Sequence, residues 1–442
     1  MILVFCPKSS SRIAYSLGLL LETHLGVEWE RAENPDEYRS HNGPRINYGG
    51  TPQDIPELYV SASGFLSERS VRAFRPEIRR KGNLPLLFPS ASKQCGMGFD
   101  PFAAAFYMVS RYEEYLPFQP DRLGRFEAGE SLAFRNGFLG VPVVDHYALL
   151  LRTALLKVFP ALVLPERKFT YIPTIDVDVA YAYRGRGGMR TFMAGMASLA
   201  RMDLQSLKQR IRVLSGREKD PYDTYDLQLQ WHAEFGLRVY YFFLCGDYGP
   251  FDRNIAFYSP VFQKLVKRIS DYAVAGLHPS FASGDHPGRL TEEIRHLAGI
   301  LKRDVRFSRQ HYLRVSFPRT YQELVRNNIT NDFSMGYASQ PGFRAGTSIP
   351  FFFYDLDREV ATNLRVFPLA AMDGTFRDYL DASPEEALTQ IRELILEVKK
   401  VNGTFISLWH NDSLSETGRW KGWRDVYRKM LEFAVQQTGR KK

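Results

Sequence analysis

From residue 166 onwards, short apolar runs alternate with stretches of helical periodicity, and this alternation limits the choice of fold more than any other feature. Helix-period stretches such as 261–273 and 383–401 separate seven runs that we expect to be strands: residues 168–178, 237–247, 273–280, 308–315, 329–337, 364–374 and 402–412. No G-x-G-x-x-G follows any of these runs, which disfavours a dinucleotide-binding sheet. The pattern predicts an α/β fold of the distorted (β/α)7 barrel type over residues 166–442.

The first part of the chain has a different pattern. Residues 10–25 have helical periodicity, and short strand candidates lie at 2–7, 27–32, 45–49, 58–63 and 84–90. Residues 100–118 begin with Asp100 and Pro101, which are typical of a helix start, and carry aromatic residues at helical spacing. We therefore expect residues 1–165 to form a smaller α/β sheet domain, whose role the sequence does not indicate.

The positive charge of the chain is concentrated in one segment. Lysine and arginine number 58 against 49 acidic residues, a net charge of +9, and residues 184–219 alone hold nine basic and two acidic residues. No zinc-finger spacing or RNA-recognition aromatic pattern accompanies this segment, so a nucleic-acid partner is not expected. A basic insertion at about 182–222 instead predicts recruitment of an anionic or lipid-linked acceptor, or peripheral membrane contact; a solvated helical face is the simpler alternative.

Composition and targeting signals place the chain in a broad class. Hydrophobic residues make up 44% and charged residues 24%, as in ordinary globular proteins. The richest apolar stretch, 147–165, is interrupted by Arg152, Lys157 and Pro160, so no membrane span is expected. The first residues lack the charged start of a signal peptide, and the three cysteines lack metal-type spacing. We therefore expect a cytoplasmic protein with reduced thiols.

Polar residues follow the apolar part of each predicted strand. Barrel enzymes carry their chemistry at the C-terminal ends of the strands, so these side chains are expected to converge on one rim. A helix cap, a turn or a core role is the alternative for each residue taken singly, and carries equal weight for Asp247 and Asp332. The full set is Asp176, Asp178, Asp247, His278, His311, Asp332, Asp373 and His410.

The residue types in this set indicate metal-assisted hydrolysis. Asp176 and Asp178 are two apart on one strand and share a face while the strand is regular. One carboxylate can bind a divalent metal together with an imidazole, and the other can act as a base; a second imidazole can act as the acid. No serine in a G-x-S-x-G elbow and no plausible cysteine nucleophile lies at a strand end, so a covalent mechanism is not supported.

These residues resemble the motifs of the polysaccharide deacetylases, the NodB-homology carbohydrate esterases that remove acetyl groups from amino sugars. The resemblance covers about 168–412 and rests on TIDVD (174–178), GLHPS (276–280), GFRAG (342–346), AAMDG (370–374) and SLWHND (407–412). The family motif H-[ST]-x-x-H is only partly matched, because Ala282 stands where its second histidine belongs. The whole chain also resembles a bacterial subgroup with an additional N-terminal α/β domain.

The resemblance implies a role for each matched residue. Asp176 would be the base and Arg344 the arginine that orients it, while Asp178 and His278 would hold a divalent metal, Zn²⁺ by expectation. His410 would be the acid, with Asp373 beside it. The implied function is hydrolysis of an acetyl group on a saccharide of the cell envelope. Aromatic residues could stack on a sugar ring or lie in the core: Phe343, Phe351, Phe352, Phe353, Tyr354 and Trp409.

The third metal ligand is a separate question. A catalytic zinc usually takes three protein ligands, and the hydroxyl of Ser283 is a poor one. His311 on the next predicted strand completes the expected set of Asp178, His278 and His311; the alternative is a core histidine beside Tyr312, with the ion held by two residues or absent. Two other functions stay open, a catalytically inactive barrel that binds glycan and a membrane or polyanion adaptor.

Overall fold

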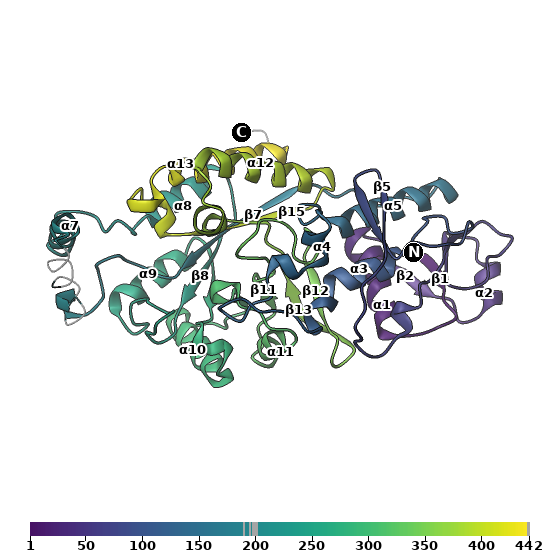
Figure 1. Ribbon diagram of the computed structural model, residues 1–442, viewed down its shortest axis with the longest axis horizontal. Coiled ribbons are helices and arrows are strands. Elements are labelled where there is room, and N and C mark those ends of the chain that lie inside the picture. The colour runs from purple at the N-terminus through teal and green to yellow at the C-terminus, as the bar shows by residue number, and fades with distance from the viewer. Residues whose placement is uncertain (189–190, 194–195, 197–201, 440–442) are drawn as a thin grey trace.

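The computed structural model describes residues 1–188, 191–193, 196 and 202–439, and contains two main sheets (Figure 1). A four-stranded sheet comes from the first part of the chain and lies at one end of the molecule, while helix α7 (Leu204–Leu214) projects at the other. Among the described helices, none combines the length and hydropathy needed to cross a bilayer.

A nine-stranded sheet carries the second half of the chain. All neighbouring strands are parallel except the antiparallel pair β12/β13. Its order is β12 (Phe351–Asp355), β13 (Val360–Val366), β11 (Asn331–Asp332), β10 (Phe307–Ser308), β9 (Val274–His278), β8 (Tyr240–Leu244), β7 (Thr170–Val177), β15 (Thr404–His410) and β14 (Ala371–Met372).

The hydrogen-bonded order begins at β12 and ends at β14, so the described strands do not form a closed barrel. The sheet is nevertheless strongly curved. The predicted strand 364–374 is two strands, and only residues 367–370 connect β13, near one end of the order, to β14 at the other. Such a short link spans at most ~18 Å, whereas seven flat inter-strand steps would need ~34 Å. The two ends of the sheet must therefore lie close together.

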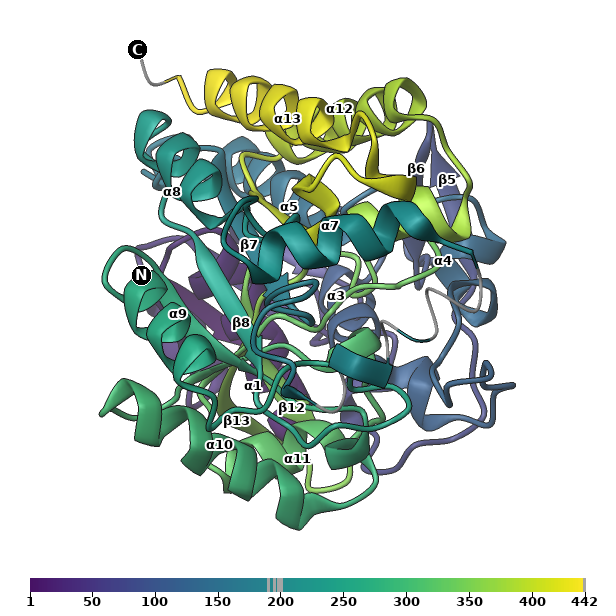
Figure 2. The same cartoon turned by 90° about the vertical axis from the view of Figure 1, so that its left-hand side faces the viewer.

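Helices flank this sheet on two sides (Figure 2). Buried apolar stripes face the sheet, and β8, with the sequence YYFFL, is buried throughout, as expected for a parallel strand covered on both faces. Helix α12 begins with a capping box between Ser383 and Glu386, which satisfies two free amide groups of its first turn. The helices are α8 (Tyr225–Glu234), α9 (Pro260–Ser270), α10 (Pro287–Leu301), α11 (Arg319–Arg326), α12 (Pro384–Lys400) and α13 (Trp423–Gln437).

The first part of the chain forms the expected strands and helices. Its parallel sheet has the order β2 (Trp29–Arg31), β1 (Ile2–Phe5), β3 (Arg45–Tyr48) and β4 (Leu58–Val60), and β5 (Ile78–Lys81) pairs with β6 (Leu84–Leu87). The helices are α1 (Ser11–Gly18), which continues as a π-helix over Leu19–His24, α2 (Pro35–Ser40), α3 (Pro101–Val109), α4 (Leu132–Arg135) and α5 (Val143–Val158).

Buried polar contacts join the two parts. Asp100 caps α3 by accepting from the amide of Ala103, and every residue of α3 is buried. Glu114, just after α3, forms an ion pair with Arg344, and Asp145 on α5 accepts a hydrogen bond from the amide of Ser348. The division into domains at residues 165 and 166 stays a prediction.

Candidate metal centre and active-site cleft

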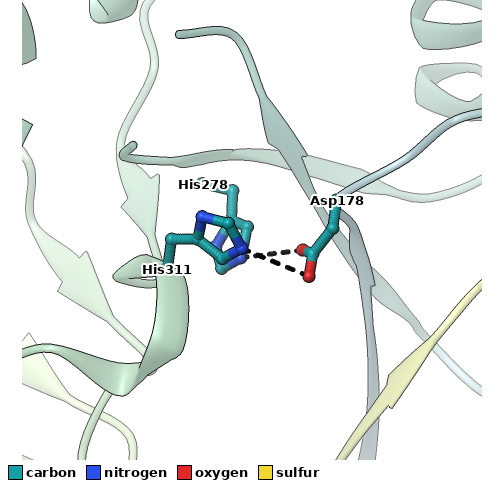
Figure 3. A group of neighbouring side chains, drawn as sticks. All are labelled: Asp178, His278 and His311. Carbon is teal, nitrogen blue, oxygen red and sulfur yellow. Dashed lines mark ion pairs between the residues drawn. The ribbon is translucent and has the colours of Figure 1, made fainter. Parts of the chain in front are cut away.

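Asp178, His278 and His311 lie together beyond the C-terminal ends of β7, β9 and β10. One potential ligand atom from each residue lies within 4.8 Å of the other two. Nε2 of His278 lies 3.1 Å from one carboxylate oxygen of Asp178, and Nε2 of His311 lies 3.3 Å from the other (Figure 3). Parallel strands bring their C-terminal ends to one edge, which explains how residues more than 130 positions apart meet here.

The hydrogen bonds behind the two imidazoles orient them toward the carboxylate. Nδ1 of His278 donates to the carbonyl oxygen of Arg309, and Nδ1 of His311 donates to Oδ1 of Asp252 at 2.8 Å. A carbonyl oxygen only accepts, so the proton of neutral His278 is on Nδ1 and its Nε2 lone pair points to the site. Metal-binding histidines are usually held in this way by a second acceptor.

The three residues fit a divalent cation. With Nδ1 donating, neutral imidazoles present lone pairs to a carboxylate, an arrangement that needs a proton or a cation between them. Oδ1 of Asp178 is buried and makes no hydrogen bond within the described part of the chain. Burial disfavours a charged His311, but Asp178 and Asp252 outweigh it and raise its pKa to about 9. Imidazole nitrogens and one carboxylate are ligands that suit zinc.

His311 was expected on a strand, and this is wrong. The strand β10 covers Phe307–Ser308, and His311 opens a short 3-10 turn, His311–Leu313. Tyr312 in this turn has a φ of +59°, an uncommon conformation for a residue with a side chain. The ring of His311 lies 4.1 Å from that of Tyr312, as the core alternative proposed, while its Nε2 still faces Asp178.

Asp176 is buried beside the three candidate ligands, and Arg309 holds it in place. Nη1 of Arg309 donates to Oδ1 of Asp176 at 2.9 Å and to the hydroxyl of Thr174 at 2.7 Å. Arg309 is itself fully buried, and its guanidinium lies 4.6 Å from the ring centre of Phe242. The second carboxylate oxygen of Asp176 makes no hydrogen bond with the residues that the structure describes and lies 3.7 Å from Nε2 of His278.

The expected role of Arg344 is wrong. Both carboxylate oxygens of Glu114 accept from Arg344, whose Nη1 donates to the carbonyl oxygen of Gly336 at 3.1 Å. Arg344 therefore ties the second half of the chain to residues before 165 and does not touch Asp176. The arginine that does is Arg309, two residues before His311, and no sequence pattern singled it out.

His410 and Asp373 form the opposite side of the site. His410 is level with Asp176 in the β15/β7 register. Asp373, directly after β14, accepts from Nδ1 and from the backbone amide of His410, each at 2.8 Å. Burial disfavours the charged imidazole, but Asp373 and Asp178 outweigh it and raise the pKa of His410 well above its usual value.

Two further candidates from the sequence lie outside the site. Asp247 is exposed on the loop after β8 and does not line the cleft. Asp332 is buried, and its carboxylate accepts from Ser308 and Ser334 instead of facing the cleft. The turn and core alternatives hold for these two residues.

The core alternative holds for five of the six aromatic residues considered for the rim. Phe352 is exposed but lies in a groove beside α1, away from the cleft. The aromatic side chains that line the cleft are Tyr312, Tyr379 and Trp420, and the cleft has a volume of about 370 Å³. The remaining predicted rim residues are buried and do not line the cleft: Phe343, Phe351, Phe353, Tyr354 and Trp409.

The cleft is acidic in its described lining. Asp176, Asp178, Asp378 and Asp412 face only two arginines, Arg125 and Arg419. Burial raises the pKa of Asp412, whose Oδ2 accepts from the indole nitrogen of Trp420 at 3.2 Å. A divalent cation would bring the charge of this lining close to balance.

The basic segment lines a groove separate from the cleft. Helix α7 and residues 416–418, immediately before Arg419 and Trp420, line this groove of about 870 Å³. Leu204, Ile211 and Leu214 are exposed on α7. Arg190 and Arg201 of the predicted basic insertion lie outside the described residues.

A family model matches the first part of the chain. Residues 2–160 match the model of a family of unknown function, DUF7033. No curated protein matches the chain.

Solved structures that resemble the chain share little sequence with it. A putative polysaccharide deacetylase from Mycobacterium smegmatis aligns with a TM-score of 0.41 and 12% identity, over 62% of this chain and 86% of that one. The polysaccharide deacetylase Bc1974 from Bacillus cereus gives 0.29 and 12%, over 60% and 88%. Puue allantoinase gives 0.36 and 9%, over 62% and 88%. These values are too low to carry an argument about activity, which must come from the site itself.

Proposed function

We propose that this protein is a metal-dependent hydrolase that removes the acetyl group from an amino sugar. One observation carries the proposal: Asp178, His278 and His311 converge within 4.8 Å, with Asp176 and His410 beside them in one cleft. A metal set, a separate carboxylate as base and a separate imidazole as acid together suffice for metal-assisted hydrolysis of an amide.

The three candidate ligands would hold the ion, for which we favour Zn²⁺. When bound, such an ion supplies Lewis-acid polarisation of a carbonyl group and lowers the pKa of water toward ~7. Nδ1 of each histidine is engaged by Arg309 or Asp252, so both rings can offer only Nε2. Because both imidazole rings are already oriented, binding of the ion requires less rearrangement of the side chains.

The remaining residues would handle protons. Arg309 occupies Oδ1 of Asp176, which leaves Oδ2 to accept a proton from the attacking water. Asp373 favours the protonated form of His410, whose Nε2 can then deliver a proton to the departing amine. Base and acid are adjacent in the β7/β15 register, so they flank the same small volume.

The second candidate function, an inactive glycan-binding barrel, was motivated by the missing histidine of the H-[ST]-x-x-H motif. His311 supplies a third candidate ligand beside Asp178 and His278, which removes that motivation. The test is metal analysis of the purified protein, followed by acetate release from N-acetylated and O-acetylated saccharides before and after chelation. We expect chelation to abolish release and Zn²⁺ to restore it. Stoichiometric metal without acetate release from any saccharide would contradict the proposal.

A further inference from the structure

The first part of the chain supplies one wall of the cleft. Arg125 belongs to residues 2–160, the region matched by the family of unknown function, yet it lines the same cavity as Asp176 and His410. It lies on the loop 118–127, in which Pro120 and Phe126 form a bridge. This part of the lining therefore comes from a residue 45 positions before Thr170, where β7 begins.

Arg125 is anchored to the elements that surround the candidate metal centre. Its Nη1 donates to the carbonyl oxygen of Tyr312 at 2.8 Å, next to His311, and its Nη2 donates to the hydroxyl of Tyr379 at 3.1 Å. Arg314 strengthens the same junction by donating to the carbonyl oxygen of Leu123 at 3.0 Å. The loop is fixed in place at the rim, close to where a substrate must enter.

The donors of Arg125 are not all used. A guanidinium carries five N–H groups, two of them on Nη1. Only one Nη1–H, the donor to Tyr312, has a recorded partner in the described part of the chain. Nε donates to Asp121 at 2.8 Å, so the positive charge is already paired with a carboxylate. The second N–H of Nη1 therefore has no partner in the described part of the chain. Because Arg125 is paired with Asp121, it does not give the cleft a positive charge.

We propose that Arg125 is a substrate-binding residue that donates a hydrogen bond to an oxygen of a neutral acetylated sugar. This inference rests on the proposed function. The pairing with Asp121 and the four aspartates of the lining argue against an anionic group at this position. Tyr312 and Tyr379, both of which accept a hydrogen bond from Arg125, line the same cleft. The cavity, at about 370 Å³, is near the lower end of the range for small-ligand sites, ~300–1,000 Å³.

The test measures binding and turnover with N-acetylglucosamine and its dimer for Arg125→Ala, Arg125→Lys and the control Arg122→Ala. Arg122 is exposed on the same loop and does not line the cleft. A hydrogen bond from a charged donor is worth ~1.5–3 kcal/mol, so we expect Arg125→Ala to raise Kd and KM ~10-fold to ~100-fold. The zinc content and kcat should stay close to the parent values, and Arg122→Ala should resemble the parent.

Each other outcome is decisive. If Arg125→Ala does not fold, Arg125→Lys takes its place in the comparison with the parent protein, because lysine keeps a positive charge opposite Asp121. Parent-like Kd in both Arg125 variants would overturn the proposal, as would loss of zinc together with binding, because the arginine would then only support the turn that carries His311. Arg125-dependent tighter binding of N-acetylglucosamine 6-phosphate would overturn the preference for a neutral sugar.

The proposed hydrolysis and this inference fail separately. Arg125-dependent saccharide binding by calorimetry without acetate release would end the proposed function and leave Arg125 as a binding residue. Acetate release from other acetylated compounds, with no binding of either saccharide, would overturn the inference about Arg125 alone.

Discussion

His311 donates from Nδ1 to Oδ1 of Asp252 at 2.8 Å, and this bond leaves Nε2 of the imidazole to face Asp178. The backbone amide of Phe281 also donates to Asp252, at 2.9 Å, so the carboxylate is itself fixed. Asp252 comes from the loop after β8, and no sequence motif marked it. It connects two strand-end loops behind the candidate metal centre.

Replacement of Asp252 by alanine should weaken metal binding. Loss of an outer partner of a metal-binding histidine typically costs 10-fold to 100-fold in affinity, because the ring is no longer held in one orientation. Competition with a chromogenic chelator measures the change, and Asp247→Ala on the same exposed loop is the control. Metal affinity equal to that of the control would show that Asp252 does not orient His311. His311→Ala should lose more affinity than Asp252→Ala, because it removes the ligand itself.

Asp176→Asn and His410→Ala should each lower kcat at least ~100-fold while the protein keeps its metal. Each change removes one positioned proton-transfer group, and such groups typically contribute 10²-fold to 10⁴-fold. Steady-state acetate release measures the effect, and His286→Ala, at an exposed histidine, serves as the control. Turnover within a few-fold of the parent would exclude the altered residue from the mechanism.

Arg344→Gln should reduce stability more than it reduces turnover. The change leaves Glu114 buried with one arginine partner instead of two, and breaking a buried ion pair costs ~3–5 kcal/mol. Urea unfolding gives the loss in free energy, and kcat of the folded fraction is expected to stay near the parent value. Arg309→Lys should show the opposite pattern, with a large loss of kcat, because lysine cannot reproduce the contacts of Arg309 with both Asp176 and Phe333. Equal effects of the two changes on kcat would contradict the assignment of Arg309.

Ionisation of Glu293 should lower the free energy of unfolding as the pH rises from about 4.5 to 7. Burial raises its pKa to about 7, although the amide of Ser280 donates to it at 2.9 Å. Because the folded pKa lies above the unfolded value, the stabilising contribution is present below pH ~4.5 and is lost as the pH rises through 7, by up to ~3 kcal/mol. Glu293→Gln should flatten this part of the pH profile of unfolding free energy, whereas Glu292→Gln, at the exposed neighbour, should not. Identical profiles for all three proteins would refute the assignment.

The basic segment is predicted to recruit an anionic acceptor, and exposed residues of α7 and its continuation allow a test. Arg210 packs 4.9 Å from the ring centre of Tyr183, so it is left unchanged to preserve the fold. Changing Lys208, Arg212 and Arg217 together to glutamate should reduce binding to anionic liposomes at least ~10-fold, because each basic residue near such a surface contributes ~1 kcal/mol.

The control for this experiment carries the same change in charge elsewhere. Exposed basic residues on other helices and loops, changed to glutamate, are Lys264, Lys267 and Arg303. Liposome flotation at two salt concentrations compares the two triple variants. Equal binding by both, with the same salt dependence, would mean that net charge rather than α7 accounts for any attraction.

Local patterns determined most of the elements and several members of the site. Apolar runs followed by polar residues predicted β7, β8, β9 and β15, because the burial of a strand depends on consecutive residues. The same runs predicted the polar residues at the strand ends: Asp176, Asp178, His278 and His410. Period and spacing also predicted the helices that begin at Ser11, Pro101 and Pro384. The grouping of His311 with Asp178 and His278 was expected too, although the strand assigned to it was not.

Only the tertiary structure decided which arginine contacts Asp176. Arg309 lies in SRQHYL and Arg344 in GFRAG, and neither string shows which arginine contacts Asp176; the choice depends on the path of the chain after β10 and on the partner Glu114, 230 residues away from Arg344. The same holds for Asp252 behind His311 and for Arg125 in the wall of the cleft. Side-chain contacts between distant segments depend on how the sheet curves and on which loops meet. Local sequence patterns determine neither of these.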